Sequence, residues 1–383
     1  MPSIYIIQKI TVHYRLKINT MPLYLDLHDL PEGITAEHVA EMHQADLDIE
    51  HKYNCRGLTY WCDEKRKTAF CLIDAPNMQA LKDLHEHAHG AIPTRIIEVN
   101  DTIVESFLGR IEDPEKSKNV SLNIINDPAF RTLMVVKLKC VALRRSELNT
   151  LKAAIRGYTT SINTLISEHK GRLVGQEGQT FLVSFDAVSD AIHCGLGIDA
   201  LYNNAITPDL EFRIGISAGI PVTAKDHIFE DTIQTSDYLS DIAKGGFSVT
   251  SDVKDLYESE NQNKPISVHK AINVLTSHAE DFIMQLMTYT EAIWSQATIS
   301  VTDFEDNLGY SKSKLYRTMM DLVGTSPNQF LREYRLNKAL ELLEQQRLNI
   351  SEIAYQTGFS SPAYFSKCFQ KKYGVLPSSI HNG

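Results

Sequence analysis

Hydrophobic and polar positions follow three different patterns along the 383 residues of this chain. Residues 21–100 alternate short strand-like runs with two amphipathic helical stretches. Residues 129–258 again mix the two periods, whereas residues 276–383 carry the helical period alone. The pattern therefore predicts a multidomain α+β chain with three domains at these bounds.

The first domain reads in order as strand, helix, two strands, helix and strand. The run "PLYLDLHDL" alternates like a strand, and the helix "TAEHVAEMHQADLDIEHKYN" follows a Thr35 cap. A hairpin, "GLTYWCDE" and "KTAFCLID", comes next, and the helix "NMQALKDLHEHAHG" ends at Gly90 before the strand "TRIIEV". This βαββαβ order predicts a ferredoxin-like domain.

The middle and C-terminal segments differ in how their elements are connected. In the middle, the strand "FRTLMVVKLKCVAL" precedes a long helix, the hairpin "RLVGQEGQTFLVSF", a second helix and the strand "LEFRIGISAGIPV", which predicts an α/β domain. Two polar segments that contain proline, 110–120 and 258–267, are the predicted linkers. At the C-terminus, residues 301–324 and 350–374 each read as helix, glycine turn and helix, joined by a long amphipathic helix over 326–346. The sequence thus predicts an all-α double helix-turn-helix domain.

Composition and charge narrow the location and the partners. With 43% hydrophobic residues, no apolar run of membrane-spanning length and charges at Lys9, Arg15 and Lys17 in the first segment, we expect a cytoplasmic protein with no membrane partner. The six cysteines include no C-x-x-C pair, which argues against a zinc ribbon or a disulfide framework. The net charge is −10, but residues 300–383 hold ten basic and eight acidic side chains. Residues 300–383, at +2, are therefore the candidate for a polyanionic partner.

The C-terminal domain resembles the DNA-binding domain of the AraC/XylS family of bacterial transcription regulators over about 100 residues. The residues that carry the resemblance are Leu315, Gly324, Pro327, Arg335, Ala339, Leu342, Leu343, Ile353, Ala354, Gly358, Phe359, Phe365, Phe369, Gly374 and Pro377. The resemblance implies that the partner is double-stranded DNA. A protein-interaction module is the weaker alternative.

The two candidate recognition helices carry the side chains that groove reading requires. Short polar groups at a helix N-terminus reach base edges, and basic groups beyond them reach phosphates. The candidate DNA-binding residues are Ser311, Lys312, Ser313, Lys314, Tyr316, Arg317, Ser360, Ser361, Tyr364, Lys367, Lys371 and Lys372. Solvated polar helix faces are the weaker interpretation, because two such sets occur at matching positions.

The middle domain resembles the class III nucleotidyl cyclases through "GQTFLVSFDAVSDAIHCGLGI" and "FRIGISAGIPV". In that family two aspartates hold the metal ions that neutralise the triphosphate. Their positions fall here on Lys137 and Gln179, and the positions of the transition-state Asn and Arg fall on Gln234 and Tyr238. We therefore expect a degenerate cyclase-like domain that forms a homodimer and has no enzyme activity. Low-affinity nucleotide binding stays open, and a residual cyclase is the competing interpretation.

The first domain resembles small bacterial ferredoxin-like proteins, some described as nickel-binding, through "LHDLPEGITAEHVAEMHQAD", "LTYWCDE", "FCLIDAP" and "AHG". It holds seven of the fourteen histidines. One helical turn separates His85 from His89, so these two share one face of their helix. His43, on the other helix, should also point toward the sheet, which offers His28 and Cys71. Nitrogen and sulfur donors suit one transition-metal ion, nickel or zinc, with Glu98 in support. The alternative is a set of core imidazoles bonded to carbonyls or carboxylates.

The histidines His38, His51 and His87 are expected to face solvent. Together these features predict a transcription regulator, not an enzyme, whose first domain senses a metal ion or a small organic effector. A metal store or chaperone is a third alternative, but it would leave the DNA-binding domain without a role.

Overall fold

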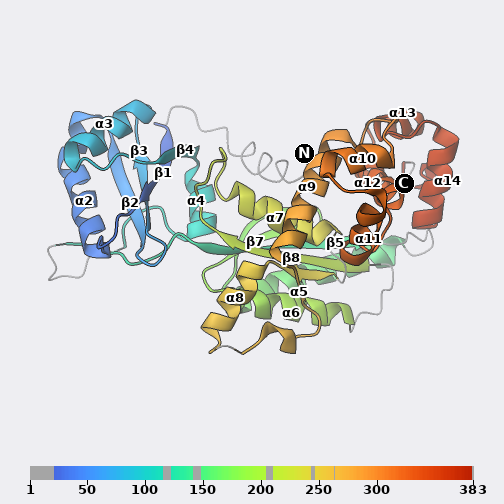
Figure 1. Ribbon diagram of the computed structural model, residues 1–383, viewed down its shortest axis with the longest axis horizontal. Helices are drawn as coiled ribbons and strands as arrows, with labels where there is room; N and C mark the ends of the chain where they lie inside the picture. Colours follow the sequence, from blue (N-terminus) through green and yellow to red (C-terminus); the bar gives the residue numbers. More distant parts are fainter. Residues whose placement is uncertain are drawn as a thin grey trace.

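The structure is a computed structural model that describes residues 21–114, 122–140, 148–203, 210–242, 246–262 and 264–381. Residues 1–20, with the three charges noted above, and positions 115–120 of the first predicted linker lie outside the described residues. A four-stranded sheet lies at one end of the molecule, a six-stranded sheet at its centre and a group of helices at the other end (Figure 1). None of the helices in these ranges is long and apolar enough to span a bilayer.

The first sheet has the order β2-β3-β1-β4, and all neighbours are antiparallel. Its elements follow the chain as β1 (Leu23–Asp29), α2 (Ala36–Ile49), β2 (Arg56–Asp63), β3 (Thr68–Asp74), α3 (Met78–Ala88) and β4 (Arg95–Val99). This is the strand and helix order that the sequence pattern predicts. Helices α2 and α3 cover one face, where Tyr60, Leu81 and Leu84 are fully buried.

The other face of this sheet is covered by helix α4 (Asp101–Leu108) and by the central sheet. Leu25 and Leu72 pack in one hydrophobic cluster with Phe107 of α4 and with Phe229. The C-terminal end of α4 is held by arginines, because the Phe107 carbonyl accepts hydrogen bonds from Arg131 and Arg172. Guanidinium groups at a helix C-terminus interact favourably with its dipole.

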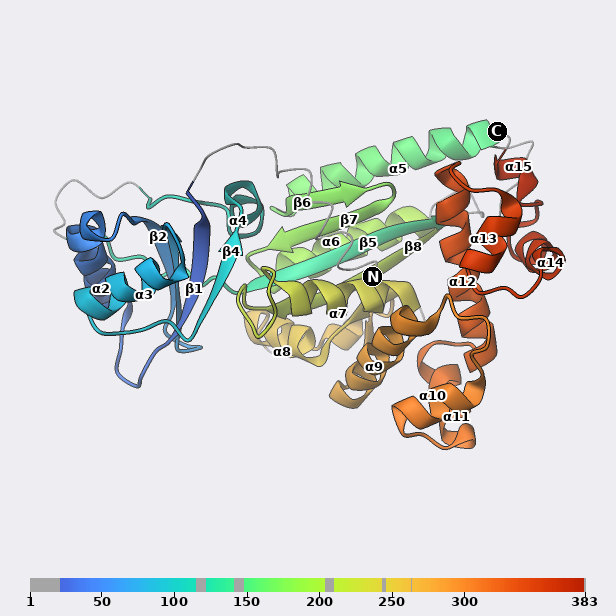
Figure 2. The ribbon, with the colours of Figure 1, turned by 90° about the horizontal axis from the view of Figure 1, so that it is seen from above.

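The central sheet has the order β10-β9-β8-β5-β7-β6. Its strands are β5 (Arg131–Cys140), β6 (Arg172–Glu177), β7 (Thr180–Phe185), β8 (Leu210–Gly219), β9 (Phe247–Val249) and β10 (Asn273–Val274). Helices α5 (Leu148–Glu168), α6 (Val188–Asn203) and α8 (Ser251–Glu260) pack on one face, and α7 (Glu230–Ile242) packs on the other (Figures 1 and 2).

The second predicted linker, 258–267, differs from the prediction. Helix α8 continues to Glu260, and Ile266 is 1% exposed in the core of the central sheet. Beyond it, β10 adds a sixth strand to that sheet. Polar composition predicted a free connection, but the buried side chain of Ile266 anchors this segment against the sheet.

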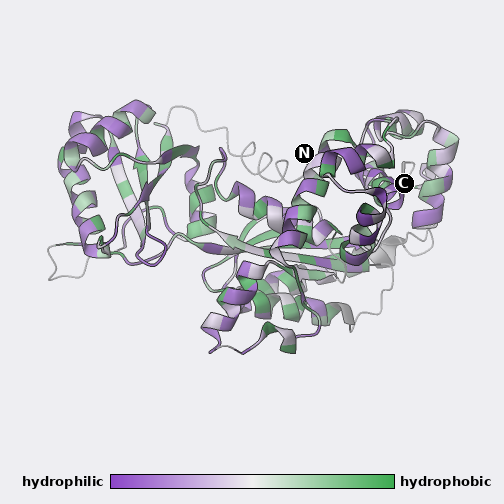
Figure 3. Cartoon of the chain, in the orientation of Figure 1, coloured by the Kyte–Doolittle hydropathy of each residue, from purple (hydrophilic) through white to green (hydrophobic). Residues whose placement is uncertain are grey.

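The C-terminal part is all helical, as predicted. It comprises α9 (Ser277–Ile293), α10 (Val301–Leu308), α11 (Lys312–Leu322), α12 (Pro327–Glu344), α13 (Ile350–Gln356), α14 (Pro362–Tyr373) and α15 (Ser378–His381). Gly309 and Gly358, which form the two helix-turn-helix corners, both have positive φ, a backbone region that favours glycine. Helix α12 contributes to the cores of both modules. Figure 3 shows hydrophilic and hydrophobic bands alternating along helices at both ends of the molecule.

Candidate metal centre and candidate nucleic-acid interface

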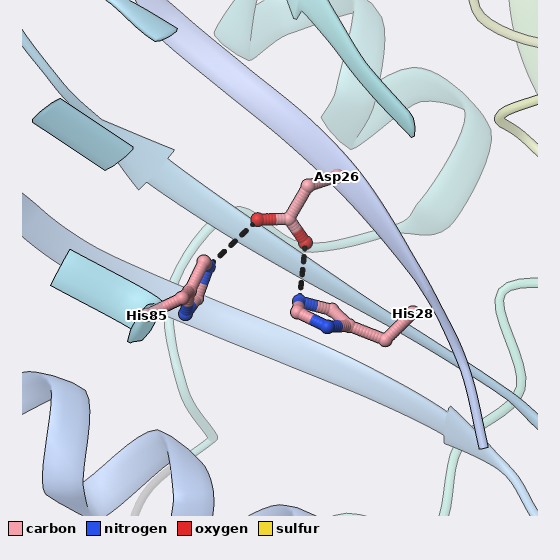
Figure 4. Close-up of side chains that lie close together, drawn as sticks. All are labelled: Asp26, His28 and His85. Carbon is pink, nitrogen blue, oxygen red and sulfur yellow. Dashed lines mark hydrogen bonds and ion pairs between the residues drawn. The ribbon is translucent and has the colours of Figure 1, made fainter. Parts of the chain in front are cut away.

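A fully buried histidine lies between two carboxylates in the first domain. His85 of α3 and Asp26 of β1 are both 0% exposed, and Asp46 of α2 is 1% exposed. The Nε2 atom of His85 is 2.9 Å from Asp26 Oδ2, and its Nδ1 atom is 3.1 Å from Asp46 Oδ1. Figure 4 shows His85 and His28 approaching the same Asp26 carboxylate.

Two further histidines extend this cluster in opposite directions. His28, also on β1, places Nε2 3.3 Å from Asp26 Oδ1. His89, just after α3, places Nε2 3.1 Å from Nδ1 of His85 and 3.3 Å from Asp46 Oδ1. In the described part of the chain these side chains form two groups able to hold a metal ion, Asp26/His28/His85 and Asp46/His85/His89. We call the five residues the His85 cluster.

The electrostatics of the His85 cluster are those of tightly paired buried charges. Burial by itself lowers the pKa of His85, but hydrogen bonds to Asp26 and Asp46 outweigh it and raise that pKa to about 10. Burial by itself raises the pKa of each aspartate, yet His28 and His85 hold the pKa of Asp26 well below its usual value, and His85 and His89 lower the pKa of Asp46. Without metal, His85 is therefore a cation that donates from both ring nitrogens. A metal ion would bind His85 only by replacing a proton.

Of the five ligands predicted from the sequence, the structure brings together His28, His85 and His89. His43 belongs to neither group, which corrects the prediction: its Nε2 lies 3.4 Å from Asp113, and its ring packs 5.0 Å from that of Tyr60. Cys71 is a second correction. The residue is opposite Asp26 on the neighbouring strand and belongs to neither group; its backbone N–H lies 3.0 Å from Asp26 Oδ1, and burial, with the Asp26 carboxylate beside it, raises the pKa of its thiol well above the usual value.

The structure also places Glu98 and the three histidines that were expected to face solvent. Glu98 is exposed on β4 opposite Tyr24, outside both groups, so the supporting role expected for it is wrong. His38, His51 and His87 are exposed, as predicted. His87 places Nδ1 2.7 Å from the Asp83 carbonyl and stacks on Tyr53.

Sequence reasoning missed Asp26 and Asp46, the two carboxylates of the cluster. A signal was present for Asp26, because a charged residue stands inside the apolar strand "LYLDLHD" and is two positions from His28, on the same face of the strand. Their hydrogen bonds to His85 are also what the core-imidazole alternative predicts, so the geometry fits both interpretations.

The candidate DNA-binding residues gather on the outer faces of α11 and α14. Ten of the twelve are exposed: Ser311, Lys312, Ser313, Lys314, Tyr316, Arg317, Ser360, Tyr364, Lys367 and Lys371. Ser361 is half-buried as the N-cap of α14, where its hydroxyl accepts a hydrogen bond from the Tyr364 N–H. Lys372 is a correction, because its amine is turned inward to Asn337 and to the Glu333 carbonyl, and burial lowers its pKa to about 8.

Of the four positions that the cyclase resemblance singles out, Lys137 lies in an ion-pair cluster. Lys137 on β5 places Nζ 2.7 Å from Asp237 and 2.9 Å from Asp241, both on α7. Gln179 is exposed in the turn between β6 and β7. Gln234 donates to the Tyr238 hydroxyl, which donates in turn to Glu291 of α9. An ammonium group with two aspartates thus occupies the position where the cyclase resemblance expects a cation-binding carboxylate.

Comparisons with known protein families find a match at each end of the chain. Residues 305–382 match a family described as a helix-turn-helix domain. Residues 24–99 match the family described as nickel responsive protein SCO4226-like.

Similar proteins include the histidine kinase P4 of Formosa agariphila, 38% identical over 108 residues, which are 28% of this chain and 8% of that protein. The transcriptional regulator GlxA of Rhizobium meliloti is 44% identical over 72 residues, 19% of this chain and 22% of that protein. Among solved structures, SCO4226 of Streptomyces coelicolor is 34% identical and covers 20% of this chain and 94% of its own, with a TM-score of 0.19. This chain thus spans less than a quarter of the length of the first two relatives.

Proposed function

We propose that this protein is a sequence-specific DNA-binding transcription regulator whose first domain senses a transition-metal ion, nickel or zinc. In this interpretation residues 21–100 are a ferredoxin-like sensor, residues 129–258 a degenerate cyclase-like domain and residues 276–383 the DNA reader. The observation that carries the proposal is the pair of exposed recognition helices at one end of a chain whose other end holds the His85 cluster. A regulator of this kind acts in the cytoplasm, where bacterial DNA lies.

The DNA-binding half of the proposal rests on the equivalence of the two modules. Counted from their N-caps, Leu315 and Phe365 occupy the same helical position and are both fully buried. Arg317 and Lys367 then also occupy one position, and both are exposed. Each module therefore presents a basic side chain on the same face, as two helices entering successive major grooves require.

The metal-sensing half rests on the donor set of the His85 cluster. Imidazole nitrogens and carboxylate oxygens together suit borderline divalent ions such as nickel and zinc. Both groups share His85, through Nε2 toward Asp26 and His28 and through Nδ1 toward Asp46 and His89. Removal of His85 should therefore abolish binding in either group, which makes it the decisive position to vary.

The test compares purified wild type with His85→Ala and the matched control His87→Ala, one half-turn away and exposed. Metal content after loading with nickel or zinc is measured by elemental analysis, and DNA affinity is measured by fluorescence anisotropy with and without the ion. We expect stoichiometric metal in wild type and His87→Ala, none in His85→Ala, and a metal-dependent DNA affinity only in the first two. A wild type that binds neither ion would favour the core-imidazole interpretation and an organic effector.

The middle domain, in this proposal, has no enzyme activity and joins two chains into a homodimer. The ammonium of Lys137 between Asp237 and Asp241 supports the loss of activity, because it places a fixed positive charge where a cyclase would hold divalent cations. A residual cyclase is the disfavoured alternative for the same reason.

A further inference from the structure

Helix α7 contacts both the sensor side and the reader side of the molecule. At its N-terminal end, Phe229 and Ile233 lie in one hydrophobic cluster with Leu25 and Leu72 of the first sheet. The ring of Phe229 lies 5.0 Å from that of Phe107 in α4. Strand β1, which contributes Leu25 to this cluster, also carries Asp26 and His28 on its opposite face.

The C-terminal half of α7 packs against the reader. Tyr238, Leu239 and Ile242 share a core with α9 and with the first helix-turn-helix module, including Leu315 of the recognition helix α11. The Tyr238 hydroxyl donates a 2.8 Å hydrogen bond to Glu291 of α9. One helix of thirteen residues therefore joins the core behind the His85 cluster to the core that positions α11.

Helix α7 is seated on the central sheet so tightly that it is a rigid connection. A Cβ on Gly215 of β8 would lie 2.0 Å from the Ser236 carbonyl oxygen, so the helix backbone rests directly on the strand. Lys137 of β5 forms ion pairs with Asp237 and Asp241 of the helix, and the Ser217 hydroxyl of β8 donates to the Thr232 carbonyl. A helix held along its whole length cannot bend to absorb a displacement at one end, since packed interiors are close to incompressible.

We propose that α7 is the element through which the sensor and the reader are coupled, which rests on the metal-sensing function proposed above. Metal binding at the His85 cluster changes how the first sheet packs on α4 and Phe229. The displacement shifts α7 as a rigid body, and α7 in turn repositions α9 and α11 relative to α14, whose core is separate. The relative placement of the two recognition helices, and with it the affinity for paired half-sites, then depends on the metal.

The experiment measures the ratio of the DNA dissociation constants without and with nickel for the full chain. Tyr238→Phe removes the hydroxyl that joins α7 to α9, and Phe229→Leu trims the contact with α4. The matched control is Tyr289→Phe, which lies on α9 but packs against Phe304 of α10. None of these residues belongs to the His85 cluster, so each variant should still bind nickel, and metal stoichiometry is measured on each to check this.

We expect Tyr238→Phe and Phe229→Leu to bind nickel and DNA but to lose roughly two- to thirty-fold of the metal-dependent ratio, the range typical of coupling variants. Tyr289→Phe should keep the wild-type ratio. The double variant should lose no more than the more affected single variant, since both act on one route.

The outcomes separate this inference from the function on which it rests. A wild type whose DNA affinity responds to nickel, together with α7 variants that respond equally, would overturn the inference alone. A wild type that binds nickel without any change in DNA affinity would overturn metal sensing and the inference together. If a variant no longer binds DNA in either state, hydrogen exchange of the α9 amides is measured instead. Nickel should change this exchange in wild type and not in Phe229→Leu. A change of equal size in both proteins would also overturn the inference.

Discussion

Removing the Lys137 ammonium should leave a buried carboxylate without a partner. The Lys137 side chain is 11% exposed and that of Asp237 is 1% exposed, and among the described residues Lys137 is the cation within 4 Å of Asp237. In a Lys137→Met variant, Asp241 keeps Lys139 at 2.8 Å, but in the described part of the chain Asp237 keeps no such partner. The loss is thus confined to one carboxylate of α7.

The loss of stability is set by the least costly response of the unpaired Asp237 carboxylate, which is to bind a proton. An unperturbed aspartate has a pKa of about 3.9, and each pH unit above it adds about 1.4 kcal/mol to the cost of keeping the acid protonated. At pH 7 the cost is about 4 kcal/mol, within the range of about 3–5 kcal/mol found when a buried pair loses one partner. Because the native state then binds a proton more tightly than the unfolded state, the loss of stability becomes smaller as the pH is lowered, reaching about 1.5 kcal/mol at pH 5.

Hydrogen exchange of the β5 and α7 amides, followed by mass spectrometry at pH 5 and pH 7, measures the free energy of opening locally. Lys139→Met is the matched control, because its side chain is 27% exposed and Asp241 retains Lys137; we expect a loss below about 1 kcal/mol at both pH values. Lys137→Met/Asp237→Leu should recover most of the stability, since an apolar pair can replace a buried ion pair. A penalty for Lys137→Met that is no larger than that of the control, or that is the same at both pH values, would refute the reasoning.

Three further predictions concern the other parts of the chain. Lys367→Ala should reduce the slope of log affinity against log salt by about 0.9, the value for one phosphate contact, whereas Lys372→Ala, whose amine is held inside the protein, should leave that slope unchanged; anisotropy titrations between low and physiological salt decide this. The metal-free first domain should be most stable below the unfolded histidine pKa of about 6.5 and should lose stability as pH rises toward 10, because the folded pKa of His85 is raised to about 10; thermal unfolding between pH 6 and pH 10 measures this, and a stability that rises over that interval would contradict it. Incubation of the purified protein with ATP or GTP and magnesium or manganese should yield no cyclic nucleotide above a contaminant control, and accumulation of one would contradict the reading of Lys137 as a replacement for a cation site.

The sequence by itself determined the features that depend on short-range order. Both helix-turn-helix modules could be predicted because their helices, caps and glycine corners lie within a few residues of one another, and Gly309 and Gly358 adopt the positive φ that such corners require. The pairing of His85 with His89 could be predicted for the same reason, since residues one turn apart on a helix share a face, and their ring nitrogens lie 3.1 Å apart. The exposure of His87 follows from the same periodicity.

Only the tertiary structure decided which distant side chains meet. Asp26 and Asp46 enter the His85 cluster because the tertiary packing of β1, α2 and α3 brings them there. The charge of Asp26 within an apolar strand marked that residue, but the sequence pattern does not say which side chains it would meet. His43 faces Asp113 instead, and the amine of Lys372 reaches Asn337 because α14 packs on α12. A periodic pattern specifies which face of an element is buried, but the partner of a buried polar group is chosen by the requirement that every such group be paired, and that requirement acts across the whole fold.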